Sequence, residues 1–391
     1  MTGIVVCGAA RTPIGKFLGG LSTVPAVELG IHATRAALER AQLEPDAVDQ
    51  VYMGMARQAG EGPNIARQIS IRGGVPETAT AMTVNQACAS GLRSIVLGAQ
   101  QILSGDAEVV VAGGVETMSR NPFLLTGMRT GYRLGDAPVL DGNFQDGFFC
   151  PLAGSPMGAT AETLATQHDI GRDEQDAYAV ESQRKAEVAQ GEGRFAKEIA
   201  PITVKMRKKE VLVDTDEHPR HGASLEGMAK LPAVFKKDGT VTAGNSSGVT
   251  DGAAALVLTS EETASARGLP VLARLEAHAM AGVDPNIMGI GPVPATRKLL
   301  DKTGYGLDDI DLVELNEAFA AQVIACDREL GLDAERLNVN GGSIALGHPI
   351  GCTGARIVVT LLHEMKKRDA KRGLATLCVS GGMGIAATFV R

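Results

Sequence analysis

The chain contains the stretch VDQVYMG at residues 48–54, and a similar stretch, IDLVELN, at residues 310–316. Two further pairs follow in the same order, GLR at 91–93 with GAR at 354–356, and VVAGG at 110–114 with CVSGG at 378–382. The offsets are 262, 263 and 268 residues. Similar offsets in one order indicate an internal duplication. The alternative to a duplication also stays open at this point. In that case the two halves are unrelated units that share common strand patterns.

Strand-like and helix-like segments alternate around these stretches, which is typical of an α/β protein. Strands are expected at residues 4–7, 48–53, 80–85 and 108–112, the last closed by Gly113 and Gly114, and helices at 26–40 and 92–103.

Residues 119–240 differ from both halves, because they are rich in Gly, Pro and charge. We expect an insertion there, with an exposed helix over residues 174–190. The predicted domains are an N-terminal half at 1–118, an inserted loop domain at 119–240, the remainder of the first half at 241–268, and a C-terminal half at 269–391.

The bulk composition limits the class of protein. The 391 residues exceed one ordinary core, and 44% are apolar, so two or three packed units are expected. A net charge of −7 argues against a general nucleic-acid or membrane-surface role. No apolar run reaches membrane-spanning length, and the apolar start reads as a strand and not as a signal peptide. Six scattered cysteines indicate free thiols in a reducing, cytoplasmic compartment, and no metal site is expected.

Cys88 is the first candidate for chemistry. It follows a predicted strand and stands just before a predicted helix. Unpaired N–H groups and the helix dipole at such a place favour a thiolate. A buried structural cysteine is the equally weighted alternative.

Three more candidates stand near predicted strand ends. His348 lies in a glycine-rich loop, Cys378 ends a short apolar strand, and Asn316 follows the strand at 312–315. His348 could instead be satisfied within a tight loop, and Asn316 could be a helix cap. Ligands bind at the carboxyl ends of strands in open α/β sheets. A nucleophile, a base, a second thiol and a polar donor at one edge suit acyl transfer.

The segments that hold these residues resemble the signature blocks of the thiolase family. They are NQACASG at 85–91, NEAF at 316–319, GGSIALGHP at 341–349 and CVSGGMG at 378–384, with supporting matches at 10–15, 113–119 and 242–253. The resemblance runs in one order along essentially the whole chain. It implies a duplicated five-layered α/β/α/β/α fold with an inserted loop domain over the active site.

The resemblance also implies roles. Cys88 would be acylated, His348 would activate it, and Cys378 would move a proton at the carbon beside the thioester. Asn316 would hold a catalytic water in one oxyanion hole. The backbone N–H groups of Cys88 and Ser380 would form the other.

Coenzyme A (CoA), acetyl-CoA and acyl-CoA are the implied partners, with no separate cofactor. The residues that resemble CoA contacts are Ser247, Ala243, Gly248, Met157, Phe235, Met288, Ala318 and Phe319, with Arg220 near the diphosphate. Ordinary core packing remains the alternative for the apolar ones. The basic run at 207–209 could attract phosphates, although a solvated loop is the usual meaning of such a run.

Two departures from the family pattern bear on specificity. Pro156 stands before Met157 where many enzymes specific for acetoacetyl-CoA carry histidine, so chain-length preference stays open. Ser380 replaces a usual glycine, and strain follows if that position needs a positive φ.

We therefore expect a thiolase that forms a homo-oligomer, a dimer or a tetramer, and that binds neither nucleic acid nor membrane. A non-catalytic acyl-CoA-binding relative and a decarboxylating ketoacyl synthase are the alternatives.

Overall fold

The spine of the molecule is a ten-stranded sheet, seen in a computed structural model that describes residues 3–206 and 209–391. Its strands run in the order β14-β15-β16-β13-β1-β12-β5-β3-β4, with β2 beside β12. The first-half strands are β1 (Ile4–Arg11), β2 (Gly15–Lys16), β3 (Gln50–Gly54), β4 (Thr80–Val84), β5 (Val109–Thr117) and β12 (Thr250–Ser260). The second-half strands are β13 (Ala273–Gly282), β14 (Leu312–Leu315), β15 (Arg372–Val379) and β16 (Met383–Val390).

The two halves are arranged alike about a short central pairing. β1 and β13 run antiparallel there, with Val5 opposite Arg274. Outward from this pair, both halves add two antiparallel neighbours and then a parallel strand, which is β3 in one half and β14 in the other. β3 then pairs in parallel with β4, and β14 makes a parallel bridge to Leu337. The predicted duplication is confirmed.

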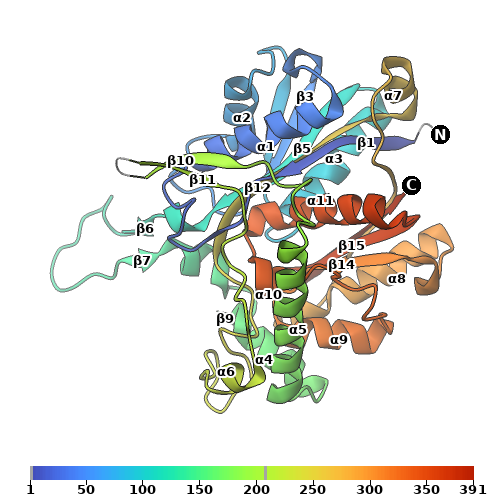
Figure 1. Ribbon diagram of the computed structural model, residues 1–391. Coiled ribbons are helices and arrows are strands. Elements are labelled where there is room, and N and C mark those ends of the chain that lie inside the picture. The colour runs from blue at the N-terminus through green and yellow to red at the C-terminus, as the bar shows by residue number, and fades with distance from the viewer. Residues whose placement is uncertain (1–2, 207–208) are drawn as a thin grey trace.

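Helices lie in three layers around the two half-sheets (Figure 1). The outer face of the first half-sheet carries α1 (Ala26–Ala41) and α2 (Ile65–Gly73), and the outer face of the second carries α8 (Pro292–Thr303) and α9 (Ala320–Leu330). Between the half-sheets lie α3 (Ser90–Ser104) and α11 (Ile350–Arg368). The predicted five-layered α/β/α/β/α fold is confirmed.

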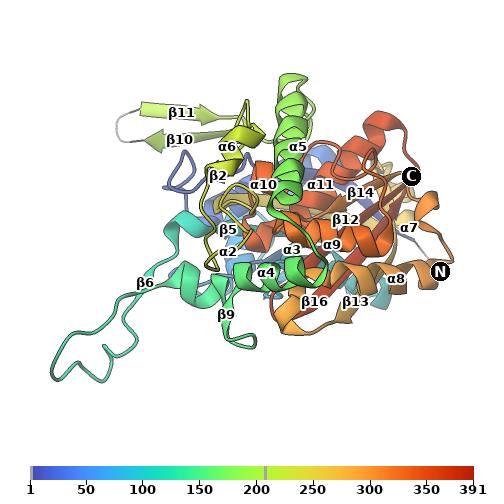
Figure 2. The same cartoon turned by 90° about the horizontal axis from the view of Figure 1, so that it is seen from below.

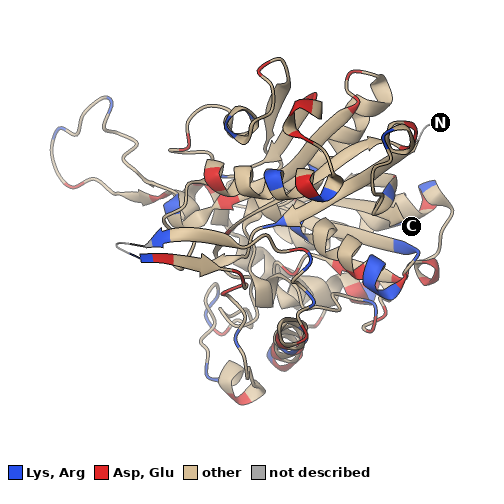
Figure 3. Ribbon diagram, turned by 45° about the horizontal axis from the view of Figure 1, so that its top comes forward, with Lys and Arg blue, Asp and Glu red and all other residues tan. Residues whose placement is uncertain are grey.

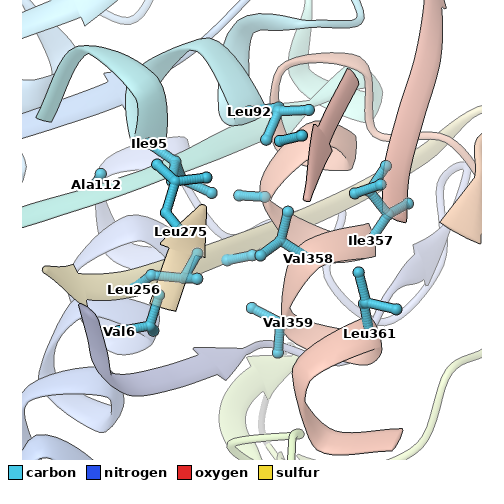
Figure 4. Packing of buried hydrophobic residues seen from close by; sticks show 14 of the residues in the cluster. Val6, Leu92, Ile95, Ala112, Leu256, Leu275, Ile357, Val358, Val359 and Leu361 are labelled. Atoms are coloured by element: carbon cyan, nitrogen blue, oxygen red, sulfur yellow. The ribbon is translucent and has the colours of Figure 1, made fainter. Parts of the chain in front are cut away.

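The central helix layer explains one of the repeated sequence pairs. Gly91 of α3 and Gly354 of α11 face the partner helix, and a Cβ on Gly91 would lie 2.5 Å from the backbone nitrogen of Ala355. The helices therefore meet backbone to backbone, which a larger residue prevents. Leu92 and Val358 fill the space between strands of both half-sheets (Figure 4), where each buried side chain contributes about 1.5–3 kcal/mol.

Two sequence-based expectations about local structure are wrong. Gly113 and Gly114 do not end a strand, because β5 continues to Thr117. A Cβ on Gly114 would clash with the carbonyl oxygen of Gly351, so this glycine allows α11 to approach the sheet. The helix at 174–190 is not an exposed one: it is α5 (Arg172–Gly191), and one of its faces is buried, including Ser182 and Ala186.

The segment between β5 and β12 folds around the sheet ends. Its elements are β6 (Phe123–Leu124), β7 (Leu140–Asp141), a π-helical turn (Phe144–Phe148), β8 (Phe149–Cys150), β9 (Ser155–Pro156), α4 (Met157–Gln167), α5, β10 (Ile202–Met206), β11 (Lys209–Val213) and α6 (Leu225–Ala229). A loop carried by β6 and β7 projects far from the body in both views (Figures 1 and 2). The domain boundaries expected after residues 118, 240 and 268 remain predictions.

A buried ion cluster fastens this segment to β1. The guanidinium of Arg11 contacts Glu198 at 2.6 Å and Asp216 at 2.7 Å, and all three side chains are almost fully buried. Removing one partner would leave a buried charge uncompensated, which typically costs 3–5 kcal/mol.

Two short helices complete the described chain. α7 (Glu261–Arg267) joins the halves, and α10 (Ser343–Leu346) precedes the loop that holds His348. In the part of the chain that the structure describes, no helix combines the length and the apolar character needed to cross a membrane. Basic and acidic residues are spread over helices and loops, and both kinds occur on the β10–β11 hairpin (Figure 3). Residues 207–208 of the basic run lie outside the described residues.

Candidate active site

Cys88 lies in the turn that joins β4 to α3. β4 ends at Val84 and α3 begins at Ser90, so the thiol stands just before the first turn of the helix, as the sequence predicts. The side chain of Asn85 accepts from the N–H of Ala87, which adopts a positive φ of 46°. This strained turn holds the backbone of Cys88 in place.

His348 faces the thiol from the other half of the chain. Its Nε2 lies 3.3 Å from the Sγ of Cys88, and its Nδ1 lies 2.6 Å from the hydroxyl of Thr353. That hydroxyl donates its proton to the carbonyl of Pro349, so it accepts from Nδ1–H. The proton therefore sits on Nδ1, and the lone pair of Nε2 points at Cys88.

Burial keeps this pair uncharged. It raises the pKa of Cys88 to about 11 and lowers the pKa of His348 to about 3. The backbone N–H groups of Ser380 and of Cys88 itself donate toward the sulfur of Cys88. These two hydrogen bonds favour the thiolate, so they oppose the rise in the pKa of Cys88. Two backbone donors thus converge where the sulfur reacts.

Cys378 lies next to Cys88 but behind an apolar wall. It belongs to β15, has no exposed surface, and packs with Met288, Ala318 and Phe319. Burial raises its pKa well above the ordinary value, and the proximity of Cys88 raises it further. The structure therefore brings the two thiols together with different surroundings.

Asn316 is not a helix cap, because α9 begins at Ala320 and its N-cap residue is Phe319. The side chain is buried, and its Oδ1 accepts from Ser343 at 2.6 Å. Arg356 donates to the same serine hydroxyl from behind at 3.3 Å. The Nδ2 group of Asn316 has no hydrogen-bond partner within residues 3–206 and 209–391, so it is an oriented free donor.

Ser380 is not strained by its position. Positive φ values occur at the next two residues, Gly381 at 85° and Gly382 at 87°, and not at Ser380. The glycines make the sharp turn after β15 because they alone adopt such angles without cost. The condition for strain at Ser380, a positive φ, is therefore not met.

One pocket of about 1250 Å³ connects these features. Cys88, His348 and Ser380 line it, whereas Cys378 and Asn316 are not among the residues that line it. All the residues expected along CoA also line it, and these are Met157, Arg220, Phe235, Ala243, Ser247, Gly248, Met288, Ala318 and Phe319.

The apolar part of that lining is tied together. The backbone N–H of Ser247 donates to Ala318 at 3.0 Å, and the rings of Phe235 and Phe319 meet edge to face at 6.1 Å. Arg220 is exposed near the mouth. An apolar channel with a cation at its entrance fits a long thioester that carries phosphates at its far end.

Sequence reasoning missed Glu116 and Arg57. The carboxylate of Glu116 accepts from the backbone N–H groups of Ala56, Arg57 and Gly351, and burial raises its pKa to about 7. It thereby joins the loop after β3 to the start of α11. The available signal was an acidic residue within the apolar run of β5 and a cation just after the end of β3.

Comparison with known proteins identifies the family. Residues 4–262 match the thiolase N-terminal domain, and residues 269–391 match the thiolase C-terminal domain. The chain belongs to the thiolase family.

Its relatives and structural neighbours agree with that assignment. Acetyl-CoA acetyltransferases of Pseudomonas aeruginosa and Escherichia coli are 54% and 50% identical to it, with all of both chains covered. Acetyl-CoA acetyltransferase of Bacillus anthracis is 47% identical at a TM-score of 0.98, and human mitochondrial 3-ketoacyl-CoA thiolase is 44% identical at 0.97. Each alignment covers 100% of this chain and 99% of the other.

The thiolase assignment confirms that the chain is an acyltransferase enzyme. The reading of a non-catalytic acyl-CoA-binding protein is not supported, because the relatives are named as acetyltransferases and the thiol–imidazole pair is intact. The match to both thiolase domains also decides against the ketoacyl synthase reading.

Proposed function

We propose that this thiolase joins acetyl-CoA to an acyl-CoA by a Claisen condensation and, in reverse, cleaves 3-oxoacyl-CoA by thiolysis through an acyl-Cys88 intermediate. One observation carries the proposal. The lone pair of His348 Nε2 points at the Cys88 thiol, 3.3 Å away, on the wall of a pocket of about 1250 Å³.

In the first half-reaction the thiol of Cys88 gives its proton to His348 and attacks the thioester carbon. The backbone N–H groups of Cys88 and Ser380 receive the negative oxygen. The bond to CoA breaks, and a proton from His348 or Cys378 neutralises the departing CoA thiolate. The product is a thioester on Cys88, which stores the acyl group for the next step.

In the second half-reaction Cys378 removes a proton from the α-carbon of acetyl-CoA. The enolate oxygen lies against His348 and a water held by the free amide of Asn316. The carbanion attacks the acyl carbon on Cys88, the carbon–sulfur bond breaks, and the thiol is restored by a proton. Thiolysis follows the same steps in reverse order.

The remaining subsites hold CoA. Ser247 and Gly248 with Ala243 lie along the pantetheine, and Met157, Phe235, Met288, Ala318 and Phe319 surround it with apolar surface. Arg220 stands near the diphosphate. Support comes from their common pocket, which continues to Cys88.

We further propose a cytoplasmic homo-oligomer, a dimer at least and a tetramer by resemblance, that works in fatty-acid β-oxidation. Six cysteines without a disulfide among the described residues favour a reducing compartment. Apolar side chains on the projecting loop, such as Phe123 (66% exposed) and Leu134 (100%), favour burial against another copy. A monomer mass by light scattering at micromolar concentration would contradict the oligomer.

Acetyl loading tests the central proposal. Incubation with acetyl-CoA should add one acetyl group to the Cys88 peptide, as measured by mass spectrometry. The Cys88→Ala variant should gain none, while Cys7→Ala, which removes a buried thiol that does not line the pocket, should load normally. An adduct that persists on the same peptide of Cys88→Ala would refute the assignment.

A further inference from the structure

Arg57 is a buried cation in the pocket wall whose hydrogen-bonding capacity is largely unused. It follows β3, is 4% exposed, and lines the same pocket as Cys88. Its Nε and Nη1 groups have no hydrogen-bond partner anywhere in the described chain. Its Nη2 makes one long contact, 3.4 Å to the carbonyl of Asn143.

The surroundings fix the guanidinium without satisfying it. It stacks on the ring of Phe148 at 4.9 Å and lies against the backbone of Gly147. The carboxylates of Glu116, Asp146 and Asp141 are near enough to act on its pKa, yet none of them forms an ion pair with Arg57 within 4 Å, and that of Glu116 is taken up by backbone N–H groups. By contrast, the buried Arg11 has close carboxylate partners on Glu198 and Asp216.

An unsatisfied buried guanidinium is costly, so a purely structural role explains it poorly. A buried donor without a partner carries the full cost of losing its water, and that cost is larger when the donor is charged. A straight-chain acyl group in this pocket would leave the cost in place. A ligand oxygen would remove it.

The location of Arg57 assigns the part of the substrate that it meets. The residues proposed for CoA, such as Ser247 and Phe235, come from the second part of the inserted segment and the loops after it. Arg57 comes from the loop beyond β3 and lies against the π-helical turn at 144–148, which lines the same pocket. The charge of Arg57 acts on the pKa values of both Cys88 and His348, so Arg57 lies near the reactive pair, where the acyl group is held, and lines the same pocket.

We infer that Arg57 selects acyl groups that end in a carboxylate, so that the preferred substrates are 3-oxoacyl-CoA esters of dicarboxylic acids. This inference rests on the thiolase function proposed above. A guanidinium only donates hydrogen bonds, and a carboxylate only accepts them, so the two satisfy each other. The phosphates of CoA lie at the opposite end of the ligand, beside Arg220.

The chemistry of the reacting atoms is unchanged. Cys88 attacks the 3-oxo carbon, the bond between C2 and C3 breaks, and the C2 carbanion takes a proton to give acetyl-CoA. The thiol of a second CoA then displaces Cys88 and returns its proton. The released acyl-CoA keeps its terminal carboxylate, which never enters the bond exchange.

Thiolysis with pairs of length-matched substrates tests the inference. Each pair has one 3-oxoacyl-CoA that ends in a carboxylate and one that ends in a methyl group, over several chain lengths. At the best length the wild-type protein should favour the carboxylate in kcat/KM by roughly 10- to 100-fold, the worth of one charge-assisted hydrogen bond. Arg57→Met should abolish or reverse this preference, and Arg57→Lys should keep part of it.

Arg72→Met is the matched control. Arg72 lies exposed on α2, where it pairs with Glu28, so its removal should leave the substrate preference as in the wild type. Circular dichroism melting of each variant shows whether it is folded, and Arg57→Lys keeps the test open if Arg57→Met does not fold.

The outcomes separate this inference from the function on which it rests. Equal kcat/KM for both members of every pair in the wild type overturns the inference and leaves the thiolase function intact, since a water then satisfies Arg57. An equal loss for both members in Arg57→Met also overturns it, because Arg57 would then act on Cys88 and not on the acyl terminus. Failure to cleave any 3-oxoacyl-CoA, acetoacetyl-CoA included, overturns the proposed function first.

Discussion

The imidazole of His348 and the thiol of Cys88 lie 3.3 Å apart although 260 residues separate them in the chain. Each belongs to a different half of the duplicated fold, at the start of one of the two helices that pack together in the central layer. The meeting of α3 and α11 therefore builds the reactive pair. Anything that moves one helix against the other moves the base relative to the nucleophile.

The free enzyme should hold Cys88 as a neutral thiol. Its pKa is raised to about 11 by burial, and that of His348 is lowered to about 3, so neither is charged at pH 7. Thiolate absorbance at 240 nm, taken as wild type minus Cys88→Ala, should be absent between pH 5 and 9 and appear toward pH 11. A difference signal at pH 7 would instead indicate a thiolate–imidazolium pair.

The same shifts predict how stability depends on pH. The pKa of His348 is depressed from 6.5 to about 3, so its contribution to folding is full above pH 6.5 and is lost as the pH falls through 3. The unfolding free energy of His348→Asn, measured in urea, should therefore fall less steeply between pH 6.5 and 4 than that of the wild type. Parallel curves would show that another group controls acid unfolding.

Thr353 should matter because it fixes the His348 tautomer. Thr353→Val keeps the shape but removes the acceptor for Nδ1–H, so Nε2 loses its oriented lone pair. Acetyl loading of Cys88 should slow by roughly 10-fold or more, part of the 10²–10⁴-fold that a general base contributes. Thr360→Val, on the same helix, loses a buried contact to Glu198 and should reduce the melting temperature without slowing loading.

The close contact at Gly91 between α3 and α11 can be tested by comparison with a helical glycine that has free space around it. Gly91→Ala places a Cβ 2.5 Å from a backbone atom of α11, so it should lower the unfolding free energy by roughly 1–3 kcal/mol. It should also slow acetyl loading, because the helices carry the reactive pair. Gly73→Ala in α2 meets nothing within 4 Å and should be neutral or stabilising. Equal effects of both substitutions would contradict the packing argument.

Local signals in the sequence predicted the alternation of strands and helices and the place of Cys88 between a strand and a helix, whereas the five layers and the roles of the reactive groups came from the resemblance to the thiolase family. Apolar runs mark the strands, and a cysteine between a strand and a helix marks the turn that holds Cys88. The prediction that Gly113 and Gly114 end the strand was wrong because a pair of glycines has two common uses. It can form a turn after a strand, or it can let another segment approach closely within a strand. Only the neighbouring carbonyls of Ala254 and Gly351 distinguish the two cases.

Arg57 and Glu116 could not be predicted as site residues, because their surroundings are made by distant segments. The hydrogen bonds of Glu116 come from the loop after β3 and from the start of α11. The burial of Arg57 depends on Phe148, 91 positions later in the chain. Similarly, the sequence of α5 is that of a polar, exposed helix, yet the hydroxyl of Ser182 donates a hydrogen bond to Glu317. Because Glu317 follows Asn316 directly, this contact supports the loop that carries Asn316.

Substitution of Cys378 should separate the two half-reactions. Cys378→Ser leaves Cys88 and His348 in place, so attack on an acyl donor needs no new group. The second step requires a base for the α-carbon of acetyl-CoA, and a serine hydroxyl in this apolar site is far too weak an acid to become that base. Condensation should fall by at least about 10²–10⁴-fold, and thiolysis should fall as well, because the C2 carbanion loses its proton donor.

Acetyl loading and α-carbon exchange, compared in the same Cys378→Ser protein, measure the two steps separately. Burial raises the pKa of Cys378 well above its ordinary value, so the group is a thiol in the free enzyme and becomes a base only after it gives up its proton. The departing CoA thiolate is a suitable acceptor for that proton, and loading should therefore slow modestly in the variant. Exchange of the α-hydrogens of acetyl-CoA with deuterated solvent should be lost.

Cys326→Ser, which replaces another fully buried thiol that hydrogen-bonds the carbonyl of Gly289, controls for the effect of a buried hydroxyl on the fold. Exchange at the wild-type rate in Cys378→Ser would assign the base to a different residue.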